Sequence, residues 1–92
     1  MTVEVADNPQ KHRFETTVDG HTAFAEYRLA DKVITFTHTL VPPELEGKGI
    51  ASALARTALK SARDRGLKVI AQCEFFASYI NRHPEEQDLL SA

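Results

Sequence analysis

Residues 44–51, Glu-Leu-Glu-Gly-Lys-Gly-Ile-Ala, place two closely spaced glycines and a lysine directly before a helical pattern. Gly47 and Gly49 allow the backbone to approach a ligand closely and to expose its amide N–H groups. The first turn of the following helix adds unpaired N–H groups and a partial positive charge, which suit a phosphate or pyrophosphate. No Ser, Thr, Asp or Asn at positions 47–50 caps these donors. The segment predicts an anion site; the alternative is a structural turn whose glycines only start the helix.

Two familiar phosphate-binding motifs do not fit this segment. A P-loop requires G-x-x-x-x-G-K-[ST], and only Gly-Lys-Gly is present at 47–49. A dinucleotide-binding fingerprint requires a third glycine near Ala51 and a full doubly wound sheet, for which 92 residues are too few. The anion site is therefore expected to belong to another kind of fold.

His38 precedes this segment by a few residues and is the first candidate for proton transfer. The alternation of the strand around it predicts that His38 shares one face with Ile34, Phe36 and Leu40, where it interrupts an apolar row. A histidine whose pKa lies near neutrality can take a proton from an attacking amine. The alternative is a partly buried imidazole that is satisfied by a neighbour.

A sheet and two helices must hold these residues in place. The first part of the chain predicts three antiparallel strands, joined by turns at Asp19-Gly20 and Asp31-Lys32. The second part predicts a helix with an apolar stripe, a short strand, and a second helix that Pro84 stops. The strands are expected at 12–18, 22–29, 33–40 and 68–73, and the helices at about Ile50 to Arg65 and Phe75 to Arg82. Residues 88–90 are expected to fold back onto the domain.

The strand-helix-strand unit in the middle predicts a right-handed crossover, with strands 33–40 and 68–73 running parallel as neighbours. Their carboxyl ends then lie on the same edge of the sheet, where ligands commonly bind. That edge carries His38, the loop at 41–49 and Cys73. The predicted architecture is thus an α+β domain in which antiparallel strands lead into a β-α-β unit and a C-terminal helix.

Length and composition restrict the remaining classes of protein. The 92 residues, 42% apolar and 26% charged, predict one compact domain over residues 1–92. A net charge of −2 without a basic stripe argues against nucleic acid, and the basic side chains of the first helix are expected to form a solvated face. One cysteine, an acidic N-terminus and no apolar run of about 20 residues predict a cytoplasmic protein that neither enters nor crosses a membrane. The three other histidines show no metal-ligand spacing, so no metal is expected.

The glycine segment resembles the acetyl-CoA signature of the GNAT superfamily, Q/R-x-x-G-x-G/A, with Glu44, Gly47 and Gly49 at its defined positions. The stretch from Thr37 to Pro43 and the later Cys73 resemble a narrower group, the minimal single-domain GNAT-like N-acetyltransferases. The similarity extends from the second strand to about Pro84. One position departs from the signature, because Glu44 stands where Gln or Arg is usual; the carboxylates of Glu44 and Glu46 are therefore expected to point to solvent.

This resemblance implies acetyl-CoA as co-substrate, held where the two parallel strands splay apart. Backbone groups at Leu40 and Val41 would pair with the pantetheine amides, and the backbone at 46–51 would hold the pyrophosphate, with added charge from Lys48. The implied coenzyme-binding residues are Leu40, Val41, Glu46, Gly47, Lys48, Gly49, Ile50 and Ala51.

The implied reaction is direct attack of an amine on the thioester, with His38 as general base. Cys73 either accepts the acetyl group as a thioester, lines the acyl pocket, or packs as a small apolar side chain. Tyr79 either protonates the departing thiolate, as a tyrosine of the matching helix does in many GNAT enzymes, or packs in the core. The acceptor is an amine, such as a protein or polyamine amine, and the protein is a monomer or weak dimer. The alternatives are a CoA-binding module without turnover and a protein-interaction module.

Overall fold

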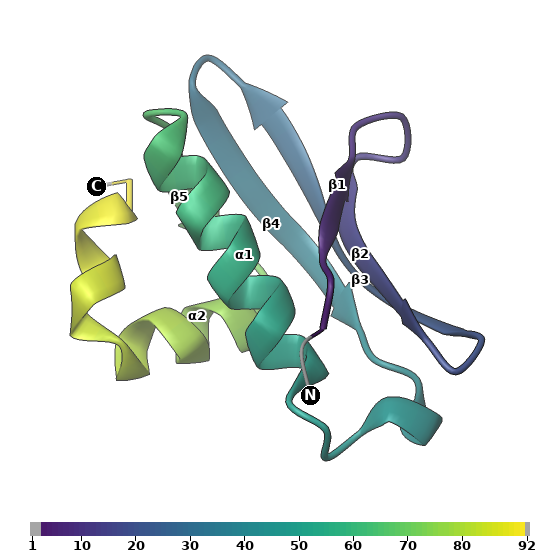
Figure 1. Cartoon of the computed structure of the whole chain (residues 1–92). Coiled ribbons are helices and arrows are strands. Elements are labelled where there is room, and N and C mark those ends of the chain that lie inside the picture. Colours follow the sequence, from purple (N-terminus) through teal and green to yellow (C-terminus); the bar gives the residue numbers. More distant parts are fainter. Residues whose placement is uncertain (1–2, 92) are drawn as a thin grey trace.

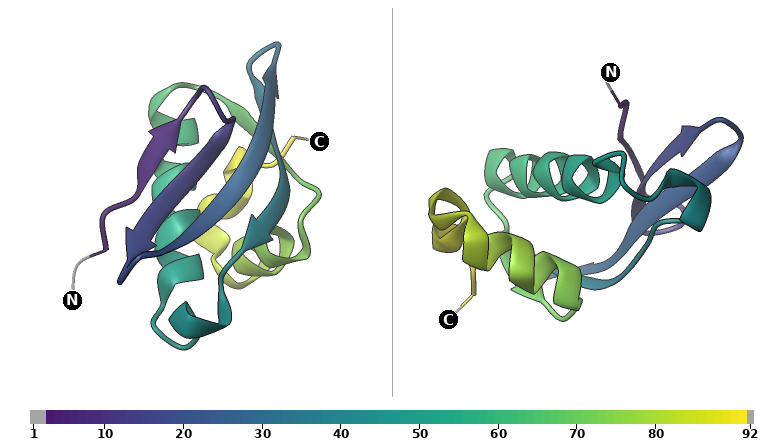
Figure 2. Two further views of the ribbon diagram at one scale, coloured as in Figure 1. Left: turned by 90° about the vertical axis from the view of Figure 1, so that its right-hand side faces the viewer. Right: turned by 90° about the horizontal axis from the view of Figure 1, so that it is seen from below.

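A five-stranded sheet in the order β1-β2-β3-β4-β5 carries both α-helices on one face, as the computed structural model of the chain shows (Figure 1). The structure describes residues 3–91, so residues 1, 2 and 92 of the expected domain lie outside it. The strands are β1 (Ala6–Asn8), β2 (Arg13–Val18), β3 (His21–Ala30), β4 (Val33–Leu40) and β5 (Lys68–Ala71). The helices are α1 (Ile50–Asp64) and α2 (Glu74–Arg82), with 3-10 helices at Pro43–Leu45 and Pro84–Leu89. Among residues 3–91, no helix covers the other face of the sheet, which we call the bare face (Figure 2).

The two hairpin turns have the geometry that their residues predict. Asp19 and Gly20 both have positive φ, 51° and 80°, and so do Asp31 and Lys32, 54° and 62°. Positive φ at both central residues matches the right-handed twist of the flanking strands. Phe14 of β2 and Ala23, Ala25 and Tyr27 of β3 are buried on the helix-facing side, whereas Leu29, which the alternation of β3 places with them, is 41% exposed. The antiparallel part of the sheet is confirmed, although β1 was not expected.

A β-bulge in β4 overturns the expected position of His38. Tyr27 pairs with Phe36, but the preceding residue Glu26 pairs with His38, so Thr37 is an extra residue in β4. The extra residue reverses the alternation of every side chain that follows it. His38 is therefore exposed on the bare face of the sheet, while Thr39 faces the helices.

Leu40, the other residue expected on the buried face, is 45% exposed for the same reason. The prediction that His38 and Leu40 share a face with Ile34 and Phe36 is wrong. Only Ile34 and Phe36, which precede the bulge, are buried against the helices.

The parallel pair β4–β5 is short and then opens. Its register runs from Val33–Lys68 to Phe36–Ala71, after which the N–H groups of Gln72 and Cys73 both donate to the carbonyl oxygen of Phe36, at 3.1 and 3.0 Å. The chain then turns into α2, so the strand expected at 68–73 ends two residues early. In the described chain, no strand pairs with the last residues of β4 on this edge, which is the splay that the fold class requires.

One apolar core lies between the sheet and the two helices. The stripe predicted on α1 is buried throughout, from Ile50 through Leu54 to Ala62. Phe36 of β4 and Phe76 of α2 stack at 4.1 Å between ring centroids and are both fully buried. Burial of side chains of this size contributes about 1.5–3 kcal/mol each, which fixes α2 against the splayed end of β4. Neither α-helix is long and apolar enough to span a membrane in the described part of the chain.

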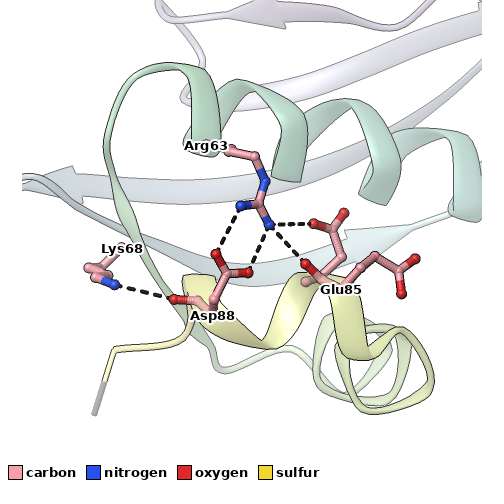
Figure 3. A network of polar contacts seen from close by, with 5 residues as sticks. Arg63, Lys68, Glu85 and Asp88 are labelled. Atoms are coloured by element: carbon pink, nitrogen blue, oxygen red, sulfur yellow. Dashed lines mark hydrogen bonds and ion pairs between the residues drawn. The ribbon is translucent and has the colours of Figure 1, made fainter.

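The C-terminal segment folds back beside β5, as expected. Leu89 is buried, and the N–H of Ser91 donates to the carbonyl oxygen of Val69 at 2.9 Å. Arg63 of α1 holds this segment through both carboxylate oxygens of Asp88, each at 2.9 Å, and through the carbonyl oxygen of Glu85 at 3.0 Å (Figure 3). The basic side chains of α1 are solvent-exposed, as predicted. Arg63 in addition links α1 to the C-terminal segment.

Candidate active site

The loop between β4 and α1 forms the centre of the site. Leu45 ends the short 3-10 helix and is 1% exposed, so it anchors the loop in the core. Gly47 and Gly49 then adopt φ of 80° and 73°, a region that costs other residues roughly 1–2 kcal/mol. In residues 3–91, a Cβ at either glycine would meet no atom within 4 Å beyond the adjoining residues of the chain. The glycines are thus required by backbone conformation, and they border open space.

A hollow of about 170 Å³ lies at this bend, against the first turn of α1. It is lined by Val41, Leu45, Glu46, Gly47, Gly49, Ile50, Ala51 and Ser52. Most of the predicted coenzyme residues therefore gather around one cavity. Leu45 and Ser52 also line the hollow but were not among the predicted residues, although the position of Ser52 in the first turn of a helix was a signal for it.

The hollow is surrounded by free backbone donors. Gly49 is the N-cap of α1, and no side chain caps this end of the helix, as the sequence predicts. The first backbone bond at this helix end joins the Ala53 N–H to the carbonyl oxygen of Gly49 at 3.1 Å. Within residues 3–91, the N–H groups of 47–52 have no acceptor, so they and the helix dipole can bind an anion.

Two predicted coenzyme residues lie outside this lining. Lys48 turns away toward the β2–β3 turn, with its Nζ 3.9 Å from Oδ2 of Asp19. Leu40 lies on the bare face at the end of β4. The coenzyme roles of these two residues, like those of the other six, stay predictions.

The acidic side chains of the loop are arranged largely as expected. Glu44 is 57% exposed and lies 3.9 Å from Nδ1 of His21. Glu46 is also exposed, although it borders the hollow. With the Lys48–Asp19 contact, the β2–β3 hairpin thus contacts the loop on both sides of Gly47.

His38 lies on the bare face beside the splayed end of the sheet. Its ring is 6.2 Å from that of Phe24, and Glu26 is its direct cross-strand neighbour on β3. The imidazole is exposed to solvent on this face.

Cys73 lies on the opposite side of β4 from His38. It is the N-cap of α2, partly buried against the core, and its thiol donates to the hydroxyl oxygen of Thr39 at 3.3 Å. Because Thr39 and His38 are adjacent in a strand, their side chains point to opposite faces. The structure therefore does not bring His38 and Cys73 side by side, but places them on the two faces of the same strand end.

Tyr79 of α2 packs in the apolar core. It is 5% exposed, and its ring stacks on His83 at 3.9 Å. Burial raises the pKa of the Tyr79 hydroxyl, so it stays protonated at neutral pH. Packing is what the structure shows for this residue, and its role as an acid stays a prediction. In residues 3–91, no three His, Cys, Asp or Glu side chains are grouped to hold a metal ion.

Comparison with known proteins decides the family. A model of the GCN5-related N-acetyl-transferase family matches residues 13–89, which include β2 to β5 and the whole loop. The chain belongs to the GCN5-related N-acetyltransferase family. Its activity class is therefore acetyl transfer, and the expected α+β fold of this family is confirmed.

Individual relatives agree with this assignment. The chain is 29% identical to protein NATD1 of Mus musculus and 28% identical to protein NATD1 of Homo sapiens, covering 95% of this chain in both and 82% and 80% of those proteins. The solution structure of a GCN5-like protein from Staphylococcus aureus matches with a TM-score of 0.75 and 28% identity, over 97% of this chain and 88% of that one.

Proposed function

We propose that the chain is an N-acetyltransferase that moves an acetyl group from acetyl-CoA to an amine. One observation carries the proposal: a hollow of about 170 Å³ that the free N–H groups of residues 47–52 border, at the start of α1. A coenzyme diphosphate is the anion that this family's chemistry requires there. Backbone donors of this kind suit it, because they are fixed and need no side-chain ordering.

The position of the splay supports a coenzyme that runs from this hollow into the sheet. Val41 borders the hollow and directly follows β4, whose end lacks a neighbouring strand beyond Phe36. A pantetheine chain placed there would bond to the unpaired edge of β4. Its thioester would then lie between the face that carries Cys73 and the face that carries His38.

In this arrangement His38 takes a proton from the acceptor amine, which reaches the thioester from the bare face. The exposed imidazole is free to do so directly or through water. Backbone N–H groups near Val41 polarise the thioester carbonyl. On the helix side, the Cys73 thiol and Thr39 hydroxyl border the acyl group, and direct attack by the amine needs no acyl-cysteine.

The experiment measures thiol release from acetyl-CoA over a panel of amines, with intact-mass analysis of the wild type and the Cys73→Ala variant. The proposal expects amine-dependent thiol release that Cys73→Ala retains, and acetylated amine as product. A mass increase of one acetyl group at Cys73 that the amine then discharges would support the covalent route instead. CoA binding without thiol release for any amine would make the chain a binding module and overturn the proposal.

A further inference from the structure

The bare face of the sheet carries a row of charged side chains that ends at His38. The register places Arg13 of β2 directly opposite Glu26 of β3, and Glu26 directly opposite His38 of β4. Residues opposite one another in a sheet point to the same face, with Cβ atoms about 4.5–5.5 Å apart. Glu26 is therefore the carboxylate that β3 places directly opposite His38.

Arg13, the cationic residue opposite Glu26, is bound to another carboxylate. The Nε of Arg13 donates to Oε1 of Glu15 at 2.7 Å, and its guanidinium carbon lies 4.6 Å from the centre of the Phe24 ring. This hydrogen bond lowers the pKa of the Glu15 carboxyl, which fits a stable ion pair. In the described part of the chain, no ion pair or hydrogen bond reaches the Glu26 carboxylate. Glu26 is thus half-buried, negatively charged and free beside the proposed base.

The bare face already binds one positively charged group, the guanidinium of Arg13. The Arg13 guanidinium is held by one carboxylate and one aromatic ring, which is the usual way that proteins bind organic cations. The Phe24 ring lies between this pair and His38, at 6.2 Å from the imidazole. An alkylammonium that approaches His38 would meet the free carboxylate of Glu26 at the edge of this aromatic surface.

We infer that Glu26 is a specificity-determining residue that binds the positively charged amine of the acceptor beside His38. This rests on the proposed function and adds the class of acceptor: a primary alkylamine, such as a lysine side chain, that is cationic at neutral pH. The nitrogen of the ammonium gives one proton to His38 before it attacks and a second proton to water as the amide forms, so the ammonium loses two protons in all. Its nitrogen forms the amide bond to the acetyl carbon, the carbon–sulfur bond breaks, and the CoA thiolate takes up a proton, so that one proton is released overall.

The test compares wild type with Glu26→Gln and with Asp31→Asn, which removes one negative charge from the turn at the far end of β3. Thiol release is measured with a primary alkylamine and with an arylamine that is neutral at the assay pH. We expect Glu26→Gln to raise the KM of the alkylamine roughly tenfold or more, the worth of a charge-assisted hydrogen bond. Its kcat should change less, and the arylamine kcat/KM should stay within about twofold. Asp31→Asn should match wild type. An unchanged alkylamine KM, or equal losses for both amines, would overturn the inference.

An NMR titration of alkylamine into CoA-loaded protein separates this inference from the proposed function. Shifts at the amides of Glu26 and His38 that Glu26→Gln abolishes would support the acceptor site even without turnover, in which case the proposed function alone fails. No shift at these amides at saturating alkylamine would overturn the acceptor site, whatever the rate of thiol release.

Discussion

Substitution of Gly49 distinguishes two interpretations of the loop before α1: a coenzyme-binding site formed by the backbone N–H groups of residues 47–52, which we call the coenzyme cradle, or an ordinary start of a helix. Gly49 and Gly66 lie at the two ends of α1, with φ of 73° and 69°, and a Cβ at either would meet nothing within 4 Å. An alanine costs roughly 1–2 kcal/mol in this conformation, and the stiffer unfolded chain returns about 0.4–1. Gly49→Ala and Gly66→Ala should therefore each lower stability by about 1 kcal/mol, or 4–8 °C in Tm for a domain of this size.

Only one of the two glycines borders the hollow. In Gly49→Ala the added methyl group enters the space of the proposed diphosphate and displaces it from the backbone N–H groups. Loss of one or two charge-assisted hydrogen bonds, each worth about 1.5–3 kcal/mol, should weaken CoA binding at least tenfold. Gly66→Ala should bind CoA like wild type.

The assays are thermal unfolding for stability and isothermal titration with CoA for affinity. Equal loss of stability with unequal loss of affinity supports the cradle. The reasoning is refuted if both folded variants bind CoA as tightly as the wild type, because the methyl group would then lie outside any ligand.

Three further predictions follow from the same structure. His38→Ala should lower kcat by about 10²–10⁴-fold with an unchanged Kd for CoA, measured by thiol release and titration; an unchanged kcat would exclude His38 as the base. Asp19→Asn frees the exposed Lys48 ammonium from its 3.9 Å contact with Asp19 and should tighten CoA binding by up to about fivefold. Lys48→Ala should weaken CoA binding. Equal CoA affinities of both variants and the wild type would exclude a phosphate-binding role for Lys48. Burial and the hydrogen bond to the Asp7 carboxylate raise the pKa of Tyr27 to about 12, so its contribution to stability is complete below pH 10 and is lost as the pH rises from 10 to 12, by at most about 2.7 kcal/mol. Denaturant unfolding from pH 9 to 12 checks this, and a Tyr27→Phe variant with the same pH dependence would contradict it.

Local rules were sufficient to predict most elements and the backbone bend at which the candidate site lies. The pair Asp19-Gly20 predicted its turn because both residues tolerate positive φ, which the structure shows. Gly47 and Gly49 predicted a bend at the start of α1 for the same reason. The stripe on α1 predicted its buried face because helical periodicity depends only on spacing along the chain.

The remainder depended on contacts between distant segments. The bulge at Thr37 is set by the register of β4 against β3, so alternation within β4 alone placed His38 and Leu40 on the wrong face. The direction of Lys48 depends on Asp19, which lies in a hairpin that no local pattern places beside the loop. β1 is held by the Tyr27 hydroxyl, which donates to Asp7 at 2.6 Å, and its three residues carry no strand pattern of their own.

The central claim, that the main chain at the start of α1 binds the coenzyme, is tested most directly by following backbone amide resonances during titration with CoA. We expect saturable shifts of the N–H signals of residues 47–52, with smaller changes at Val41 and along the end of β4. Shifts confined to other segments, or none at all at millimolar CoA, would contradict the claim.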